Sequence, residues 1–354
     1  MTNLSETLLN LISSETRFSD ILLESEAPIM LKTSRGWVDS GELDYPSWVD
    51  ISEFLDGIDP GWNKDIESGA INRPLNLHSC RLRINAYLAF GGKTLMASIR
   101  LIPNNPPALS EIGLPGTARL LMENSSGLIL ISGPTGSGKT TTMSAMVDVI
   151  NDTRNAHVIT IEDPIEFVFT RKKSIFSQRE IGVDCPTFLD GVKDAMRQRP
   201  DVIVIGEIRD RDTAEQAIIA GESGHLVIGT LHASSAVGTL SKLLGFFPSQ
   251  EREARLQSLG GSLVGIVSQT LIPKKDGSGY ALAVDFLANH KRQHSRALGD
   301  PDKLQASMDR NEDGVSVGLS ASVSKLIQGG AVDKAEAAKA VAGNAAVYDK
   351  IRNL

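Results

Sequence analysis

Residues 127–143 read GLILISGPTGSGKTTTM, and this stretch restricts the possible folds more than any other in the chain. An apolar run leads directly into three glycines and a lysine, and a threonine-rich stretch with helical spacing follows. Residues 133–140 satisfy the pattern G-x-x-x-x-G-K-[S/T], whose glycines let backbone N–H groups approach phosphate oxygens. A helix that begins at this point turns its positive end toward the same anion. The sequence therefore predicts a strand, a loop and a helix that together bind a nucleoside triphosphate.

The predicted binding residues for ATP and Mg²⁺ are those of the loop and of the first turn of the following helix. They are Gly133, Pro134, Thr135, Gly136, Ser137, Gly138, Lys139, Thr140 and Thr141. We expect the Lys139 ammonium to reach the β- and γ-phosphates and the Thr140 hydroxyl to ligate Mg²⁺. The alternative is a flexible glycine loop without a ligand, which does not require the flanking strand and helix.

Three further apolar runs, at 157–162, 201–207 and 225–232, have the composition of buried strands. Helix-like stretches such as TTTMSAMVDVIND and TAEQAIIAGES separate the apolar runs. Continuous apolar strands that alternate with helices are typical of a parallel sheet whose two faces are both covered. The fold class predicted for this region is α/β.

Two other regions flank this predicted sheet. Residues 1–104 contain short strand-like pieces separated by glycine, aspartate and proline, which indicates a smaller α+β domain. The proline-rich segment 105–111 is the predicted linker, and 112–290 is the predicted ATP-binding domain. The alanine-rich tail 291–354 has helical spacing and predicts a C-terminal helical extension.

Polar side chains follow the predicted strands at the points where they end. Glu162 and Asp163 end the second strand, Glu207 ends the third, and the fourth begins at His225 and ends at His232. Because ligands of open α/β sheets bind at the carboxyl ends of the strands, such residues can complete a triphosphate site. A carboxylate there holds the water shell of Mg²⁺ or takes a proton from the attacking water. The alternatives are a solvated carboxylate and, for a histidine within an apolar run, a satisfied core residue.

The composition restricts the partners and the compartment. The formal net charge of −7 and the pI of about 5.5 argue against a surface that broadly matches nucleic acid or anionic lipid. Cys80 and Cys185 have no metal-ligand spacing, so we expect two buried thiols in a reducing compartment and no zinc. Because neither a signal peptide nor a span of about 20 apolar residues is evident, we expect a cytoplasmic protein.

Four stretches together resemble the signature boxes of the type II/type IV secretion and pilus ATPase superfamily. They are GPTGSGKTT, TIEDPIEF, MRQRPDVIVIGEIRD and ESGHLVIGTLHASSA, similar in order to the Walker A, Asp, Walker B and His boxes. The resemblance covers about residues 112–290, and a weaker one extends back to near residue 18. It implies a RecA-like P-loop ATPase domain behind a PAS-like N-terminal domain, in a homohexameric ring. It also implies a cytoplasmic enzyme that is recruited to inner-membrane components of a secretion, conjugation or pilus machine, without stable nucleic-acid binding.

The same resemblance implies roles for individual residues at the strand ends. Glu162 would be the general base, with Asp163 beside it, and Glu207 would bind the Mg²⁺ shell. His232, and less directly His225, would sense the γ-phosphate or line the subunit junction.

Three arginines of the N-terminal region, Arg81, Arg83 and Arg100, resemble family arginines that bind the nucleotide phosphates. The planar guanidinium suits this role because it binds phosphate bidentately and always stays charged. The alternative for each arginine is a structural ion pair or a solvated strand edge.

Two departures from the family's pattern indicate a branch. Assembly-type members carry a paired CxxC zinc module, which two isolated cysteines cannot form. Retraction motors carry an AIRNLIRE-like motif where residues 286–304 read FLANHKRQHSRALGDPDKL, and residues 34–45 also differ from the usual N-terminal segment. The prediction is therefore a type IVB secretion or conjugative transfer ATPase, with a type IV pilus retraction ATPase as the alternative.

Two other function classes share this core. A RecA-type nucleic-acid translocase is disfavoured by the acidic balance and by the absence of aromatic residues among basic ones. A regulatory nucleotide binder without hydrolysis does not require two carboxylates at the strand ends.

Overall fold

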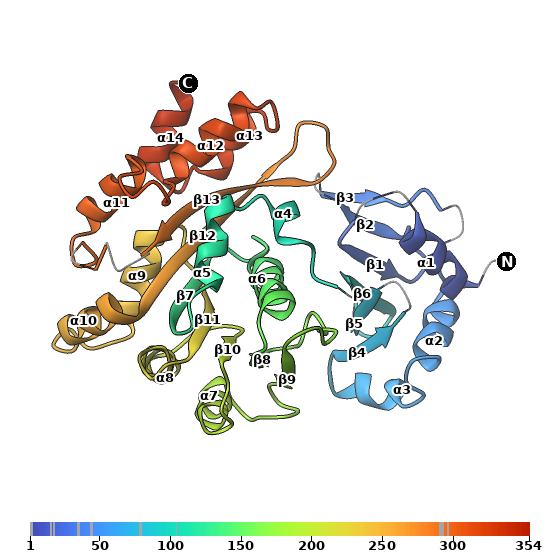
Figure 1. Cartoon of the computed structure of the whole chain (residues 1–354). Helices are drawn as coiled ribbons and strands as arrows, with labels where there is room; N and C mark the ends of the chain where they lie inside the picture. The colour runs from blue at the N-terminus through green and yellow to red at the C-terminus, as the bar shows by residue number, and fades with distance from the viewer. Residues whose placement is uncertain are drawn as a thin grey trace. The chain divides into compact units, whose positions relative to one another are not determined.

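The structure is a computed structural model of the chain, and it describes residues 3–14, 16, 18–33, 36–42, 45–77, 80–103, 105–289, 294–295 and 297–354. The chain divides into two compact units, Met1–Asn104 with Asp276–Tyr280, and Asn105–Lys275 with Ala281–Leu354. Figure 1 shows the course of the chain through both units.

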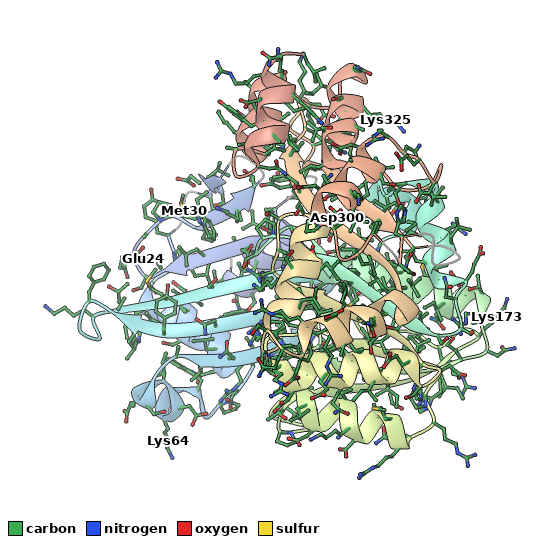
Figure 2. All side chains as sticks on the ribbon, turned by 90° about the vertical axis from the view of Figure 1, so that its left-hand side faces the viewer. Glu24, Met30, Lys64, Lys173, Asp300 and Lys325 are labelled. Carbon is green, nitrogen blue, oxygen red and sulfur yellow. The ribbon has the colours of Figure 1, made fainter. Side chains whose placement is uncertain are left out.

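The first unit is an antiparallel sheet of six strands with helices packed on one face (Figure 1). The strand order is β3-β2-β1-β6-β5-β4. The strands are β1 Asp20–Glu24, β2 Met30–Thr33, β3 Gly36–Asp39, β4 Ile71–Asn76, β5 Cys80–Ala89 and β6 Thr94–Pro103. The helices are α1 Leu4–Ser13, α2 Trp48–Asp56 and α3 Trp62–Asp65, which runs into the 3-10 turn Ile66–Ser68. Figure 2 labels Glu24 and Met30 on the adjacent strands β1 and β2 and Lys64 on α3.

The second unit is built on a sheet of seven strands in the order β13-β12-β7-β11-β10-β8-β9. The strands are β7 Gly127–Ser132, β8 His157–Glu162, β9 Ile175–Glu180, β10 Val202–Ile205, β11 Leu226–Leu231, β12 Leu263–Pro273 and β13 Tyr280–Ala288. All neighbours from β12 to β9 are parallel, as the alternation of strands and helices predicts. Strands β9, β12 and β13 were not among the predicted strands, and β9 has the largely polar sequence IFSQRE.

Helices cover both faces of this sheet, so that β7, β10 and β11 are buried along their whole length. One face packs against α4 Leu109–Ile112, α5 Arg119–Met122 and α6 Lys139–Thr153. The other packs against α7 Phe188–Arg197, α8 Arg211–Glu222, α9 Ala236–Gly245 and α10 Arg252–Ser262. Burial on both faces explains why these strands read as continuous apolar runs rather than as alternating ones.

The predicted linker differs from the structure in detail, whereas the predicted C-terminal extension is helical. The predicted linker 105–111 overlaps helix α4, and Leu109 of that helix is buried in the core of the second unit. The tail forms α11 Pro301–Asp309, α12 Leu319–Gln328, α13 Lys334–Ala340 and α14 Ala345–Arg352. Figure 2 labels Asp300, whose carboxylate caps α11, and Lys325 near the end of α12.

Several residues on which the predicted branch depends lie outside the described part of the chain. They are residues 34, 35, 43 and 44 of the stretch 34–45, and residues 290–293 and 296 of the stretch 286–304. Among the described residues, no helix is both long enough and apolar enough to cross a bilayer. Cys80 and Cys185 are buried free thiols, and burial raises the pKa of Cys185.

A buried carboxylate on β13 joins two helices of the second unit. Asp285 is 1% exposed, and its Oδ2 accepts the N–H of Ala236, the first residue of α9, at 2.8 Å. Its Oδ1 accepts the N–H of Leu319, the first residue of α12, at 3.1 Å. Burial raises the pKa of Asp285, while the two backbone hydrogen bonds favour its charged form. Because helix N-termini carry unpaired N–H groups, this one carboxylate stabilises both helix ends.

We predict that Asp285→Asn lowers the free energy of unfolding by about 1–3 kcal/mol, because the amide has one acceptor oxygen and leaves a buried N–H unpaired. Urea denaturation followed by circular dichroism measures the change. Asp349→Asn, on an exposed position of α14, is the matched control and should unfold as the parent does. A parental midpoint for Asp285→Asn would mean that this carboxylate does not hold the two helices.

Candidate nucleotide-binding site

Four neighbouring parallel strands bring the predicted site residues to one edge of the seven-stranded sheet. In spatial order, β7 ends at the phosphate loop 133–140, β11 ends before His232, β10 ends before Glu207, and β8 ends at Glu162. Parallel pairing places all four ends on the same side. This is the edge at which open α/β sheets bind ligands.

The phosphate loop needs glycine at its first position for steric reasons. Gly133 has φ of 150°, and a Cβ there would lie 2.3 Å from Ser137 Oγ and 2.8 Å from the backbone oxygen of Gln269. Gly136 and Gly138 also have positive φ. The loop therefore folds tightly against β12, on which Gln269 lies.

The loop leads directly into helix α6, which begins at Lys139 and has Gly138 as its N-cap. Pro134, Thr135 and Gly136 are exposed, whereas Ser137 is buried. Thr140 and Thr141, at the start of α6, are half-buried. The first N–H groups of this helix and an exposed loop form an arrangement that suits an anion.

The Lys139 side chain turns back over the loop. Its Nζ donates hydrogen bonds to the backbone oxygens of Gly133 and Pro134, each at 3.1 Å. Burial lowers the pKa of Lys139, and the carboxylates of Glu207 and Glu166 offset part of that effect. The ammonium group therefore lies inside the loop, where a phosphate can replace the two carbonyl oxygens as its partner.

His232 connects Lys139 with Glu207. The Nδ1 of His232 lies 3.4 Å from Lys139 Nζ, and its Nε2 lies 3.1 Å from Glu207 Oε1. Because an ammonium group only donates and a carboxylate only accepts, this geometry assigns the proton of a neutral imidazole to Nε2. Three predicted site residues, at the start of α6 and just beyond the ends of β11 and β10, thus form one connected chain.

Glu207 is held as a charged carboxylate. Arg209 Nη2 donates to Glu207 Oε2 at 2.8 Å. Burial raises the pKa of Glu207, but the hydrogen bond and charge of Arg209, with His232 and Lys139, outweigh it and hold the pKa below its ordinary value. Asp163 is half-exposed, and its Oδ2 lies 4.0 Å from Arg209 Nη1.

Glu162 has the opposite environment, although it ends the strand adjacent to that of Glu207. It is 4% exposed, and burial raises its pKa above the ordinary value. Its Oε1 accepts the hydroxyl of Thr160 at 2.7 Å and Nε2–H of Gln178 at 3.3 Å, and these bonds oppose the effect of burial. The site therefore contains one carboxyl whose pKa is raised and one whose pKa is lowered.

His225 does not belong to this edge. It precedes the first residue of β11, and its Nδ1 lies 3.1 Å from the backbone oxygen of Ala220. The six residues of β11 separate it from His232, which at about 3.3 Å per residue is roughly 20 Å. His225 therefore lies at the opposite edge of the sheet from the phosphate loop of its own chain, because the two ends of a strand lie on opposite edges, and its place at the subunit junction stays a prediction.

The three predicted arginines lie together on one face of the sheet of the first unit. Arg81 and Arg83 occupy the positions of β5 that alternate with buried residues. Arg83 is the cross-strand neighbour of Arg100 on β6, and Arg100 Nε donates to Asp20 Oδ1 at 2.8 Å. The structure thus contains the ion pair that the sequence analysis gave as the alternative for Arg100, and phosphate binding by these arginines stays a prediction.

Three polar residues that support the site were not predicted. Thr160 and Gln178 are cross-strand neighbours on β8 and β9, and Gln269 on β12 donates to Thr142 of α6 at 2.6 Å. Thr160 could have been found from the sequence, because it lies two residues before Glu162 and so on the same face of the strand. Gln178 and Gln269 could not, because their positions depend on how β9 and β12 pair with the sheet.

Comparison with known proteins identifies the family. Residues 68–312, which are more than half of the chain, match the family described as Type II/IV secretion system protein. The chain belongs to this family. It is 36% identical over 274 residues to the uncharacterized protein YggR of Escherichia coli K12, covering 75% of this chain and 81% of YggR. It is 41% identical over 207 residues to the type IV pilus retraction ATPase PilT of Pseudomonas aeruginosa, and the match covers 58% of this chain and 59% of PilT.

Solved structures extend the likeness to both units. The pilus retraction motor PilT with bound ADP has a TM-score of 0.82 at 33% identity, and the match covers 96% of this chain and 97% of that one. The Legionella pneumophila ATPase DotB has a TM-score of 0.84 at 25% identity, and the match covers 96% of this chain and 95% of DotB. These matches confirm the predicted fold, an N-terminal α+β domain followed by a RecA-like ATPase domain, and the chain is an ATP-hydrolysing enzyme.

We predict that Lys139→Ala weakens ATP binding about 10- to 100-fold, because hydrogen bonds to charged groups contribute about 1.5–3 kcal/mol each. Titration with a fluorescent ATP analogue measures the dissociation constant. Lys173→Ala is the control, since Lys173 is an exposed lysine outside the site (Figure 2). Parental affinity in Lys139→Ala would exclude the loop 133–140 as the triphosphate site.

Proposed function

We propose that this chain is the Mg²⁺-dependent ATPase subunit of a homohexameric ring motor that acts on inner-membrane components of a secretion or conjugation machine. The observation that carries the proposal is the row of strand ends at one sheet edge, from the phosphate loop through His232 and Glu207 to Glu162. Each part of a triphosphate-hydrolysing site has a residue of suitable chemistry in this row.

ATP binding is the task of the loop and of Lys139. The backbone N–H groups of 133–140 and the N-terminus of α6 receive the phosphates, and the Lys139 ammonium exchanges its two carbonyl partners for phosphate oxygens. His232 then loses its contact with Lys139 Nζ. Because the Nε2 of His232 still faces Glu207, binding of a γ-phosphate beside Lys139 changes the surroundings of Glu207 through His232.

Thr140 and Glu207 fit a magnesium ion. Mg²⁺ is bound through one or two protein oxygens together with substrate phosphates and water, so a larger set of ligands is not required. The lowered pKa of Glu207 keeps its carboxylate charged, which is the form that a hard cation needs. The bound ion would neutralise charge on the β- and γ-phosphates.

Glu162 is the residue that takes the proton of the attacking water. The water oxygen forms a bond to the γ-phosphorus, and the bond from that phosphorus to the β–γ bridging oxygen breaks with its electron pair going to ADP. The water's proton passes to Glu162 and later to solvent. A pKa raised toward neutrality suits this role, because a base is most effective when its pKa is near the working pH.

The arginine face of the first unit supports a motor rather than a simple hydrolase. Two arginines directly across from each other, Arg83 and Arg100, repel one another, and Arg100 pairs with the carboxylate of Asp20. An anion is therefore a favourable ligand for this face. If that anion is a nucleotide phosphate, the loss of the γ-phosphate changes the charge that this face binds, and the first unit then responds to each turnover.

The system in which such a ring works has two candidates. Residues 286–304 lack the AIRNLIRE-like motif of retraction motors, which supports a type IVB secretion or conjugative transfer system. The 41% identity to a pilus retraction ATPase supports the alternative, type IV pilus retraction. Co-purification of the tagged chain with inner-membrane proteins from its host, followed by mass spectrometry, distinguishes the two systems.

We predict that Glu162→Gln binds ATP within a few-fold of the parent and hydrolyses it about 10²- to 10⁴-fold more slowly, because it lacks the base. Glu207→Gln should also be slow, but its residual turnover should rise with added Mg²⁺, which that of Glu162→Gln should not. Phosphate release as a function of Mg²⁺ concentration separates the two. Parental turnover in Glu162→Gln would assign the base to another residue.

We further predict a hexamer in the presence of ATP and Mg²⁺, and loss of most turnover in Arg100→Ala. Asp20→Asn is the matched control, since it breaks the same ion pair and leaves the arginine in place. An exposed ion pair contributes only about 0.2–1 kcal/mol, so both variants should fold. Light scattering gives the mass, and a monomer at tens of micromolar protein with ATP and Mg²⁺ would contradict the ring. Equal turnover in Arg100→Ala and Asp20→Asn would contradict the role of the arginine in the motor.

A further inference from the structure

Glu162 is surrounded by hydrogen-bond donors that the reaction itself does not require. Thr160 Oγ1 donates to Glu162 Oε1 at 2.7 Å, and Gln178 Nε2 donates to the same oxygen at 3.3 Å. Thr160 and Gln178 lie directly opposite each other on β8 and β9. With Glu162 two residues beyond Thr160, the three side chains share one face of the sheet.

The orientation of the Gln178 amide is determined by its other partners. Its Oε1 accepts the N–H of Phe169 at 2.9 Å, and its Nε2 donates to the backbone oxygen of Phe167 at 2.7 Å. Because a backbone N–H only donates, the atom facing Phe169 must be the oxygen, and the nitrogen must face Glu162. Gln178 thus offers a donor to Glu162 and cannot turn its oxygen there without losing both backbone bonds.

Gln178 also fixes the segment that follows Glu162. Phe167 and Phe169 belong to the stretch 163–170, and the ring of Phe169 stacks on that of Phe176 of β9, with centroids 4.7 Å apart. The N–H of Ile165 in the same stretch donates to Glu180 Oε2 at 3.1 Å. Strand β9 therefore holds both the carboxyl and the chain that leaves it.

We propose that Gln178 and Thr160 are positioning residues that hold Oε1 of Glu162, so that its other oxygen accepts the proton of the attacking water. This inference rests on the proposed role of Glu162 as the base. It assigns a function in the reaction to β9, whose polar sequence lies outside the motifs that predict the site.

The hydrogen bonds have a consequence for the dependence of turnover on pH. Burial raises the pKa of Glu162, and the two side-chain donors lower it, as does the backbone N–H of Glu166. The charged groups near this carboxyl are Glu166, whose charge raises its pKa, and Glu180, its cross-strand neighbour on β9. Removing a donor therefore raises the pKa of the base further, and turnover is lost at a higher pH as the solution is acidified.

The test measures kcat and KM for ATP between pH 5.5 and 9 in Gln178→Leu and Thr160→Val, with the full chain. We expect kcat at pH 7 to fall about 10-fold or more, KM to change less than about 3-fold, and the acid limb of kcat to move up by roughly one pH unit. Ser177→Ala is the matched control. Ser177 is adjacent to Gln178 on β9, bonds His157 at 3.0 Å, and points to the opposite face.

Thr160→Val protects the test against misfolding. Gln178→Leu also releases the backbone of Phe167 and Phe169, whereas Thr160→Val keeps the shape of the side chain and removes one hydroxyl. A shift of the acid limb of kcat in Thr160→Val is sufficient to support the inference, whatever Gln178→Leu shows. Parental pH profiles and parental kcat in both variants overturn it.

A double variant separates this inference from the proposed function. If Gln178 acts through Glu162, then adding Gln178→Leu to Glu162→Gln should cause no further loss of kcat. A further 10-fold loss in the double variant contradicts the positioning role. If Glu162→Gln itself has parental turnover, the role of Glu162 as the base is wrong and the inference is overturned with it.

Discussion

Parallel pairing of β7, β11, β10 and β8 is the constraint on which the site depends. In a parallel sheet the carboxyl ends of neighbouring strands lie at one edge. Residues that follow these ends therefore lie close together even when they are far apart in the sequence. The strands themselves are apolar because helices cover both faces. The charged side chains of these four strands therefore stand at or beyond the strand ends, and this concentrates the phosphate loop, His232, Glu207 and Glu162 in one row.

The row contains two carboxyls whose pKa values are shifted in opposite directions, and their surroundings explain the difference. Glu207 lies among Arg209, His232 and Lys139, and this positive surrounding outweighs the effect of burial. Glu162 lies one strand further out, with neutral donors from Thr160 and Gln178, and burial dominates there. Two carboxyls whose pKa values move in opposite directions suit a metal ligand and a proton acceptor.

Elements outside the motifs hold the site in place. Strand β9 is polar, yet its Gln178 contacts both the buried carboxyl and the chain after it. Asp285 of β13 bonds the N-terminus of α9, whose first residue follows His232 closely in the sequence, and the N-terminus of α12 in the tail. Asp285 therefore joins the helix that follows His232 to a helix of the C-terminal tail.

The sequence alone determined the α/β class, the four central strands, the phosphate loop and the three strand-end residues Glu162, Glu207 and His232 that the structure brings together beside it. Local patterns suffice for these features, because a buried parallel strand is a continuous apolar run and a phosphate loop has a fixed spacing of glycines and lysine. The tertiary structure alone decided which strands lie beside β7 and in which order. It also decided that Gln178 and Gln269 approach the site and that Arg100 pairs with Asp20. These contacts depend on the register and order of strands that are distant in the sequence, and no local pattern contains that information.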